Sequence, residues 1–273
     1  MTPDSPIGVF DSGVGGLTVL KALVAQLPRE RFVYLGDTAR LPYGTKSPET
    51  VVRYALQAAE ALADYGVKCL VVACNTASAV GLAAVSQRIC DVPVIGVIEP
   101  GAEAACLASR SGHIAVIATE GTVRGGAYQD AIVRRRSDAR VSAVPAQLFV
   151  ALAEEGLCSG PIAESVARHY LDPLFNSRVR ASHPDTLVLG CTHFPMLAQA
   201  IRSAVGPEVG IVDSAETTAR YVRQTLESEG LAAHAGEGGL RLLATDAADR
   251  FARIGGRFLE RPIRPHEVEL VDL

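Results

Sequence analysis

The sequence of 273 residues contains no tryptophan, and aromatic residues make up only 5% of it. Stacking platforms for nucleic-acid bases or sugar rings need aromatic side chains, so neither is expected. Basic residues are not in excess either, since 26 lysines and arginines stand against 30 aspartates and glutamates, for a net charge of −4. Because a broad nucleic-acid surface requires clustered positive charge, we expect no nucleic-acid partner.

Long apolar runs are also missing. No uninterrupted apolar stretch approaches the roughly 20 residues that a helix needs to cross a bilayer, so no membrane association is expected. The sequence starts Met-Thr-Pro-Asp-Ser-Pro, without the basic start and small-residue cleavage site of a secretory signal peptide. We therefore expect a cytoplasmic protein whose cysteines remain free thiols.

Six cysteines are present, and none has the spacing of a structural zinc site. Hydrophobic residues make up 48% of the chain and charged residues 21%, which is typical of a globular protein with a sizeable core. Most of the cysteines are expected to be small buried core residues. They are Cys69, Cys74, Cys90, Cys106, Cys158 and Cys191.

Short apolar runs alternate with longer amphipathic segments along the chain. This alternation is typical of βαβ units, and strands that are apolar throughout suit parallel sheets covered on both faces. We expect strands at Ile7–Phe10, Phe32–Leu35, Cys69–Ala73, Val94–Val97, Ile114–Ala118, Val141–Val144, Thr186–Leu189, Val209–Val212, Leu240–Ala244 and Glu267–Leu270. Helices are predicted at Leu17–Leu27, from Pro48 to about Tyr65 with Ser47 as N-cap, and at Ala77–Ile89 and Ala247–Ile254.

One pattern occurs twice in the chain. Val71–Thr76 and Val188–His193 both run apolar, apolar, small, cysteine, polar, polar, and a helix pattern follows each. Ile7–Ser12 and Ile114–Thr119 likewise both lead from an apolar strand into a short polar turn. Two such repeats in the same order indicate two related α/β halves. Because open α/β sheets bind ligands beyond the carboxyl ends of their strands, both strand-end cysteines are expected at one cleft.

The predicted fold is therefore α/β, with two pseudosymmetric, doubly wound domains, mainly parallel sheets, and an active site in the cleft between them. The first domain is expected to comprise residues 1–97 plus 208–273 and to carry Cys74. The second is expected to comprise residues 98–207 and to carry Cys191. The two points at which the chain passes from one expected domain to the other then lie near prolines, which favour turns.

The two strand-end cysteines each precede a helix, whose N-terminal N–H groups lower the pKa of a thiol. Inert burial is the alternative. A redox pair usually places its cysteines two residues apart, and a metal site of Cys74, Cys191 and His193 has scattered spacing. The remaining chemistry is proton transfer. One thiolate removes the Cα proton from one face of an amino acid, and the opposite thiol returns a proton to the other face.

Polar residues at the same strand ends are candidate helpers. Asp11 is suited to orient a substrate ammonium, and His193 to exchange protons with Cys191, with helix capping as the alternative for both. The turn 13–16 is rich in glycine but lacks the Lys-Ser/Thr of a phosphate-binding loop, and its N–H groups suit a carboxylate equally well. Further donors or turn residues with the same two interpretations are Asn75, Thr76, Thr192, Pro42, Tyr43 and Gly44.

Together, the segments Asp11–Leu17, Gly36–Ala39 with Pro42–Gly44, Ala73–Ser78 and Gly190–His193 closely resemble glutamate racemase, and the resemblance covers nearly the whole chain. It implies an isomerase that interconverts L-glutamate and D-glutamate through two thiols and supplies D-glutamate for peptidoglycan synthesis. It also implies a reaction without pyridoxal phosphate, nicotinamide or a metal. Glutamate is then the small-molecule partner, and a homodimer is one assembly open to the protein.

By this resemblance, Cys74 and Cys191 are the catalytic acid/bases, Asp11 assists Cys74, and His193 assists Cys191. Glu154 matches a further carboxylate of the family, although Ala151 stands where the family usually has proline and a second glutamate adjoins. The substrate-binding positions that match are Asp11, Ser12, Pro42, Tyr43, Gly44, Asn75, Thr76, Thr192 and His193.

Two other functions remain open on the sequence. The first is a related racemase that acts on aspartate or a hydantoin. Glutamate and aspartate differ by one methylene group, and a pocket distinguishes such substrates by only about 1–3 kcal/mol. A two-lobed amino-acid-binding protein is the non-enzymatic alternative, but it needs no paired cysteines and usually carries an export signal. Loss of optical rotation in L-glutamate distinguishes both from a glutamate racemase.

Overall fold

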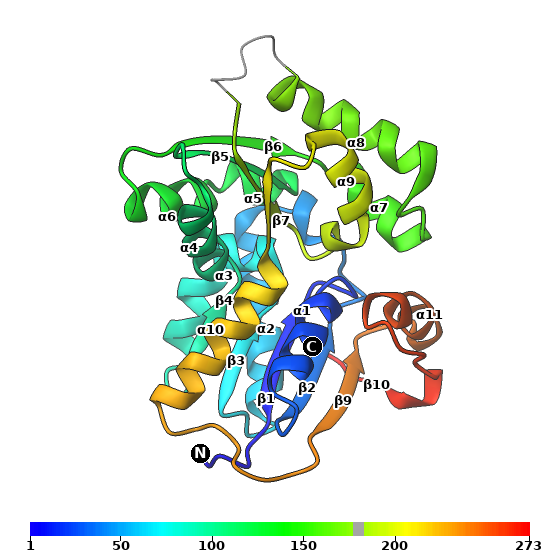
Figure 1. The fold of residues 1–273 in the computed structure, drawn as a ribbon. Helices are drawn as coiled ribbons and strands as arrows, with labels where there is room; N and C mark the ends of the chain where they lie inside the picture. The colour runs from blue at the N-terminus through cyan, green and yellow to red at the C-terminus, as the bar shows by residue number, and fades with distance from the viewer. Residues whose placement is uncertain (177–182) are drawn as a thin grey trace.

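The computed structural model describes residues 1–176 and 183–273, and it has two parallel β-sheets surrounded by helices (Figure 1). Every strand pair in the two sheets is parallel. Three central strands, β1, β3 and β7, are buried along their whole length, as expected for sheets covered on both faces. The predicted α/β class with parallel sheets is confirmed.

The first sheet has the strand order β10-β9-β2-β1-β3-β4. Its strands are β1 (Ile7–Asp11), β2 (Arg31–Gly36), β3 (Cys69–Val72), β4 (Val94–Gly96), β9 (Gly239–Ala244) and β10 (Val268–Leu270). The helical segments that accompany it are α1 (Leu17–Gln26), η1 (Tyr43–Thr45), α2 (Pro48–Ala63), α3 (Asn75–Arg88), α11 (Ala248–Phe258) and η4 (Pro265–Glu267). Strands from early and late in the chain meet where β9 pairs with β2.

The second sheet has the order β6-β5-β7-β8. Its strands are β5 (His113–Ala118), β6 (Arg140–Pro145), β7 (Thr186–Gly190) and β8 (Gly210–Asp213). Its helical segments are α4 (Ile98–Ala108), α5 (Glu120–Arg124), α6 (Ala127–Arg135), α7 (Leu148–Glu155), α8 (Gly160–Phe175), η3 (Phe194–Leu197), α9 (Ala198–Val205) and α10 (Ser214–Ser228).

One strand lies in a different sheet from the one that the sequence suggests. The expected boundary at residue 208 puts residues 210–213 with the first sheet, but β8 pairs with β7 in the second. The chain therefore returns to the first sheet only after Asp213, through α10 and the segment that follows it. Pro207 lies in the turn before β8 and does not mark the crossing between the sheets. The division into two domains itself stays a prediction.

Helices α4 and α10 join the two halves of the molecule. Each follows a strand at a point where the chain passes between the sheets, and the two helices pack against each other, while α10 also packs against α1. A single cluster of buried apolar side chains runs through this region, from Leu20 in α1 and Ala102 in α4 to Leu187 in β7 and Val222 in α10. The two sheets are thus held at a shared core, with their carboxyl ends facing each other.

Local signals in the sequence explain where individual elements begin. The Ser47 side chain accepts a hydrogen bond from the Thr50 backbone N–H at 3.4 Å, and Pro48 occupies the first turn, so α2 starts as predicted. Across residues 1–176 and 183–273, every helix is too short or too polar to cross a membrane.

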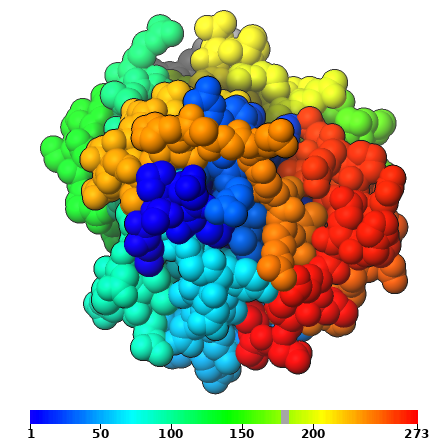
Figure 2. All heavy atoms as spheres, turned by 90° about the horizontal axis from the view of Figure 1, so that it is seen from below, coloured from blue at the N-terminus to red at the C-terminus, as the bar shows by residue number. Residues whose placement is uncertain are grey.

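The face opposite the pocket brings together distant parts of the chain. Figure 2 shows the N-terminal residues beside the segment that follows α10. Beneath them, Lys68 and Glu30 form a buried ion pair with 2.5 Å between Nζ and Oε2. Glu30 also accepts a hydrogen bond from the backbone N–H of Ala233 at 2.8 Å. This pair fixes the segment after α10 to the amino ends of β2 and β3.

Candidate active site

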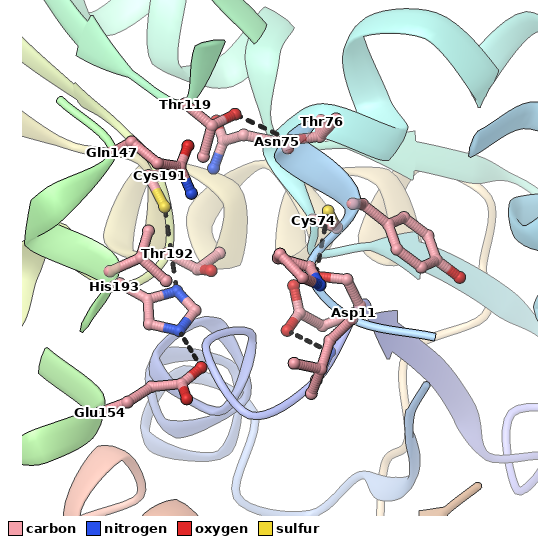
Figure 3. A pocket seen from close by; sticks show the side chains of 17 residues that line it. Asp11, Cys74, Asn75, Thr76, Thr119, Gln147, Glu154, Cys191, Thr192 and His193 are labelled. Carbon is pink, nitrogen blue, oxygen red and sulfur yellow. Dashed lines mark hydrogen bonds and ion pairs between the residues drawn. The ribbon is translucent and has the colours of Figure 1, made fainter. Parts of the chain in front are cut away.

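A pocket lies between the carboxyl ends of the two sheets and contains about 470 Å³ of space free of protein atoms, its mouth included (Figure 3). Every candidate site residue named from the sequence lines it. From the first half these are Asp11, Ser12, Pro42, Tyr43, Gly44, Cys74, Asn75 and Thr76, and from the second half Glu154, Cys191, Thr192 and His193.

The two candidate thiols stand on opposite sides of this pocket (Figure 3). Cys74 is the second residue after β3 of the first sheet, and Cys191 is the first residue after β7 of the second. Both side chains are buried, with 5% of their surface exposed. All six cysteines of the chain are free thiols in the structure. The repeated sequence pattern therefore correctly predicted that both cysteines face one cleft.

Cys74 is the N-cap of α3. Its Sγ accepts a hydrogen bond from the Ala77 N–H at 3.4 Å and lies 3.7 Å from the Ser12 hydroxyl. Burial, with a further contribution from the negative charge of Asp11, raises the pKa of Cys74 to about 12, although the Ala77 N–H and Ser12 oppose this shift. The position at a helix N-terminus predicts a lowered pKa instead. At Cys74 the loss of hydration outweighs the effect of the helix on the thiol pKa.

Cys191 begins a row of interacting groups. Its Sγ is 3.8 Å from Nδ1 of His193, whose Nε2 is 3.3 Å from Oε1 of Glu154. Burial lowers the pKa of His193, but the hydrogen bonds to Cys191 and Glu154 outweigh burial and raise it to about 10. The hydrogen bond to His193 in turn lowers the pKa of Glu154. Cys191 and Glu154 thus both favour the charged, imidazolium form of His193.

The His193 ring is held on two further sides. Phe258 of α11 packs edge to face against it, with 5.2 Å between ring centroids. On another side is the turn after β1, where a Cβ on Gly15 would lie 2.4 Å from Cε1 and Nδ1 of His193. Glycine at this position therefore lets the turn pack directly on the imidazole.

Asp11 ends β1 beside Cys74. Its Oδ2 accepts a hydrogen bond from the Gly13 N–H at 3.0 Å, and Oδ1 is buried without a hydrogen-bond partner in the described part of the chain. Burial raises the pKa of Asp11, against the positive charge of His193 and hydrogen bonds from Gly16 and Gly13. An unpaired buried acceptor facing a pocket is suited to a ligand donor such as an ammonium group.

Asn75 offers the complementary group. Its Oδ1 accepts a hydrogen bond from the Tyr128 hydroxyl at 2.8 Å, which fixes the orientation of the amide. Its Nδ2 is buried and has no acceptor among residues 1–176 and 183–273. Next to it, the Thr76 hydroxyl lies 2.9 Å from that of Thr119 in the second half. An oriented donor at the start of α3 is suited to a carboxylate.

Tyr43 contributes less than the sequence suggests. The turn at Pro42–Gly44 predicts that the phenol reaches the cleft, but the Tyr43 hydroxyl donates a hydrogen bond to Asp37 Oδ2. Asp37 also pairs with Arg40, with 2.7 Å between Oδ2 and Nε. The phenol is therefore engaged within the first half, and its hydroxyl is not free for a ligand.

Four lining side chains were not identified from the sequence: Leu41, Thr119, Gln147 and Val150. Thr119 ends the repeat that matches Ile7–Ser12, so internal symmetry could have indicated it. Gln147 is the N-cap residue of α7 and has a buried Oε1 without a partner in the described ranges, and no sequence motif marks it.

The arrangement combines two opposed thiols with oriented polar groups. Among the residues that the structure describes, no three His, Cys, Asp or Glu side chains are grouped so as to hold a metal ion, so the trio Cys74, Cys191 and His193 does not form such a site. What the pocket offers instead is one candidate acid/base on each side of a small ligand, and fixed donors and acceptors around it. This geometry suits proton transfer at opposite faces of one carbon atom.

Comparison with known proteins gives consistent results. The profile of the family described as Asp/Glu/Hydantoin racemase matches residues 7–222. The glutamate racemase of Geobacter metallireducens is 50% identical over 94% of this chain and 93% of the relative. The solved structure of glutamate racemase from Francisella tularensis in complex with D-glutamate has a TM-score of 0.90 and 35% identity, covering 99% of this chain and 98% of that one. The glutamate racemase structure from Thermus thermophilus, in complex with beta-chloro-D-alanine, has a TM-score of 0.88 and 44% identity, covering 100% and 99%.

Proposed function

This chain belongs to the Asp/Glu/Hydantoin racemase family, and from that premise we propose that it interconverts L-glutamate and D-glutamate. The observation that carries the proposal is the pair of buried thiols, one from each sheet, on opposite sides of one small polar pocket. The relatives named as glutamate racemases support glutamate over aspartate or a hydantoin as the substrate.

In the proposed reaction, the Cys191 thiolate removes the Cα proton of L-glutamate, and the electron pair of that bond delocalises into the α-carboxylate. The Cys74 thiol then donates its proton to the opposite face of Cα. The products are D-glutamate, a Cys191 thiol and a Cys74 thiolate. The reverse reaction starts from this state, and exchange with solvent restores either protonation state.

The two halves of the pocket favour the thiolates in different ways. On one side the charged His193, 3.8 Å from Cys191, stabilises a thiolate by charge and hydrogen bonding. On the other side no cation of the described ranges is among the main influences on Cys74, and burial with the charge of Asp11 raises its pKa to about 12. We infer that the substrate ammonium itself supplies the missing positive charge when it binds near Asp11 and Cys74.

The carbanionic transition state needs stabilisation of charge that develops on the α-carboxylate. The free Nδ2 of Asn75 and the N-terminus of α3 are oriented for this carboxylate, and the free Oδ1 of Asp11 is suited to the ammonium. Ser12, Thr76, Thr192 and the turn at Pro42, Tyr43 and Gly44 complete the proposed binding site. On this proposal the reaction proceeds without pyridoxal phosphate, nicotinamide or a metal.

The biological role follows from the product. We propose that D-glutamate made by this protein is used for peptidoglycan synthesis, which places the protein in the cytoplasm, where the precursors are made. Assembly as a homodimer stays a prediction that the single chain does not test.

The test is to incubate the protein separately with L-glutamate and with D-glutamate in heavy water. Both solutions should lose their circular dichroism and reach the racemic mixture. Deuterium should appear at Cα of the product early, with little in the remaining substrate, because the incoming proton comes from the opposite, solvent-equilibrated thiol. Faster racemisation of aspartate would favour the related racemase instead. Binding of glutamate without loss of its dichroism would favour the binding protein.

A further inference from the structure

Helix α11 contacts the row of groups behind Cys191 from the other half of the molecule. The Arg250 Nη2 donates a hydrogen bond to Glu154 Oε2 at 2.8 Å. Two turns further along the same face of the helix, Arg257 donates to the backbone carbonyl oxygen of the same glutamate. α11 follows β9 of the first sheet, whereas Glu154 lies in α7, after β6 of the second sheet. Two arginines thus hold one glutamate across the junction between the sheets.

The two carboxylate oxygens of Glu154 have different partners. Oε1 faces Nε2 of His193 at 3.3 Å, and Oε2 pairs with Arg250. Glu154 is the last residue but one of α7, where the helix macrodipole disfavours a negative charge. A cation on Oε2 offsets this repulsion. It also leaves Oε1 as the oxygen that faces the imidazole.

We propose that Arg250 is a positioning residue for the half of the reaction that uses Cys191, acting by holding Glu154 in place against His193. The inference rests on the function proposed above. On this view Arg250 does not touch the substrate. It fixes the carboxylate that orients the imidazole, and the imidazole stabilises the thiolate.

The packing of α11 distinguishes this role from a role in folding. The helix is anchored by apolar side chains that are at most 3% exposed, namely Phe251, Ile254 and Phe258. The Arg250 side chain is 46% exposed, so its removal leaves these anchors in place. Arg253 lies on the same helix, is exposed, and has no hydrogen-bond or ion-pair partner within the described ranges. It therefore provides a matched arginine for a control.

Racemisation alone does not test the inference. The equilibrium constant between enantiomers is fixed, so any variant lowers kcat/KM equally in both directions. A reaction that needs only one base separates the two sides. With 3-chloroglutamate, the base removes the Cα proton, and the electrons of the Cα–H bond form a double bond between Cα and Cβ. The C–Cl bond at Cβ breaks at the same time, and chloride leaves with both electrons of that bond. Release of chloride from each Cα enantiomer thus reports on one cysteine.

Arg250→Gln should slow chloride release from the L-configured analogue by about two- to fivefold, which corresponds to the loss of a partly exposed ion pair. Release from the D-configured analogue should stay at the wild-type rate. Arg250→Lys should recover part of the loss because it keeps the charge. Arg253→Gln should match wild type with both enantiomers, and all three variants should unfold at the same urea concentration as wild type.

Two results would overturn the inference alone: Arg250→Gln that matches Arg253→Gln with both enantiomers, or Arg250→Gln that slows both enantiomers equally. In either case the wild-type protein still releases chloride and still racemises glutamate. A wild-type protein that does neither would overturn the proposed function, and this inference with it.

Discussion

Replacing Gly15 by alanine should displace His193 from Cys191. The Cβ of an alanine at this position would lie 2.4 Å from Cε1 and Nδ1 of His193 and 2.4 Å from Oγ1 of Thr192. An ordinary contact is about 3.5 Å or more, so the added methyl group comes at least about 1.1 Å too close to three atoms. Both neighbours are side chains of the proposed site, so relief of the clash moves the groups that serve the reaction.

The His193 ring has little room to retreat. Glu154 Oε1 is 3.3 Å from Nε2, and the Phe258 ring packs at 5.2 Å on another side. Overpacking of this kind costs about 1–3 kcal/mol of folding free energy. Loss of a positioned acid/base partner costs about 10²–10⁴-fold in rate. We therefore expect racemisation to fall by about 100-fold or more, with a decrease of only about 1–3 kcal/mol in the free energy of unfolding.

The assay is the decay of the circular dichroism of L-glutamate, paired with urea unfolding of each variant. Gly210→Ala is the control, because a Cβ there would meet its nearest atom at an ordinary 3.6 Å and the position is exposed in β8. It should leave the rate unchanged. A folded Gly15→Ala variant that racemises glutamate at the wild-type rate would refute the reasoning, since His193 would then not need its observed position.

Three other predictions concern the thiols, acid stability and cofactors. Cys74→Ser and Cys191→Ser should each lower racemisation by orders of magnitude, because a serine hydroxyl is too weak an acid to form the anion. Each variant should still eliminate chloride from one enantiomer of 3-chloroglutamate, and the same preference in both would contradict the assignment of faces. Asp185 has a pKa of about 2, since hydrogen bonds from Ser109 and Ser111 outweigh the opposing effect of burial. Its contribution to stability should be complete above the unfolded-state pKa of about 3.9 and disappear as the pH falls through about 2. The gap in unfolding free energy between wild type and Asp185→Asn should thus narrow from pH 5 to pH 2, and a constant gap would contradict this. Dialysis against EDTA should leave the racemisation rate unchanged, and loss of activity that an added metal restores would show that the reaction needs one.

Strand positions could be predicted from the sequence because these strands are buried on both faces. A strand such as Cys69–Val72 is a continuous apolar run, and its limits are visible without knowledge of its neighbours. Which sheet a strand joins depends on contacts far along the chain. Val209–Val212 would suit either sheet by composition, and only its pairing with β7 decides. The assignment of this strand to the first half was wrong for that reason.

In the site, too, residues could be located from the local sequence, whereas their contacts with distant parts of the chain could not. The pocket is reached by residues at the carboxyl end of a strand or just beyond it, such as Asp11, Cys74 and Cys191, because the carboxyl ends of parallel strands form its walls. The helix that contains Arg250 was predicted, but its contact with Glu154 depends on how α11 packs against the other half. The pKa of Cys74 was likewise misjudged, since burial is a property of the assembled pocket.

The pairing of β9 with β2 has a consequence for how the protein is made. β2 ends at Gly36 and β9 begins at Gly239, so about 200 residues must be translated before the edge of β2 is covered. At about 5–20 residues per second, the ribosome needs roughly 10–40 s to translate the segment between β2 and β9. The second sheet is complete once Asp213 has been made. The first sheet, by contrast, exposes the unpaired edge of β2 until β9 has been translated, and an exposed apolar edge favours aggregation. Helix α11 is translated after β9, so the contacts of Phe258 with His193 and of Arg250 with Glu154 form only after the second sheet has been made.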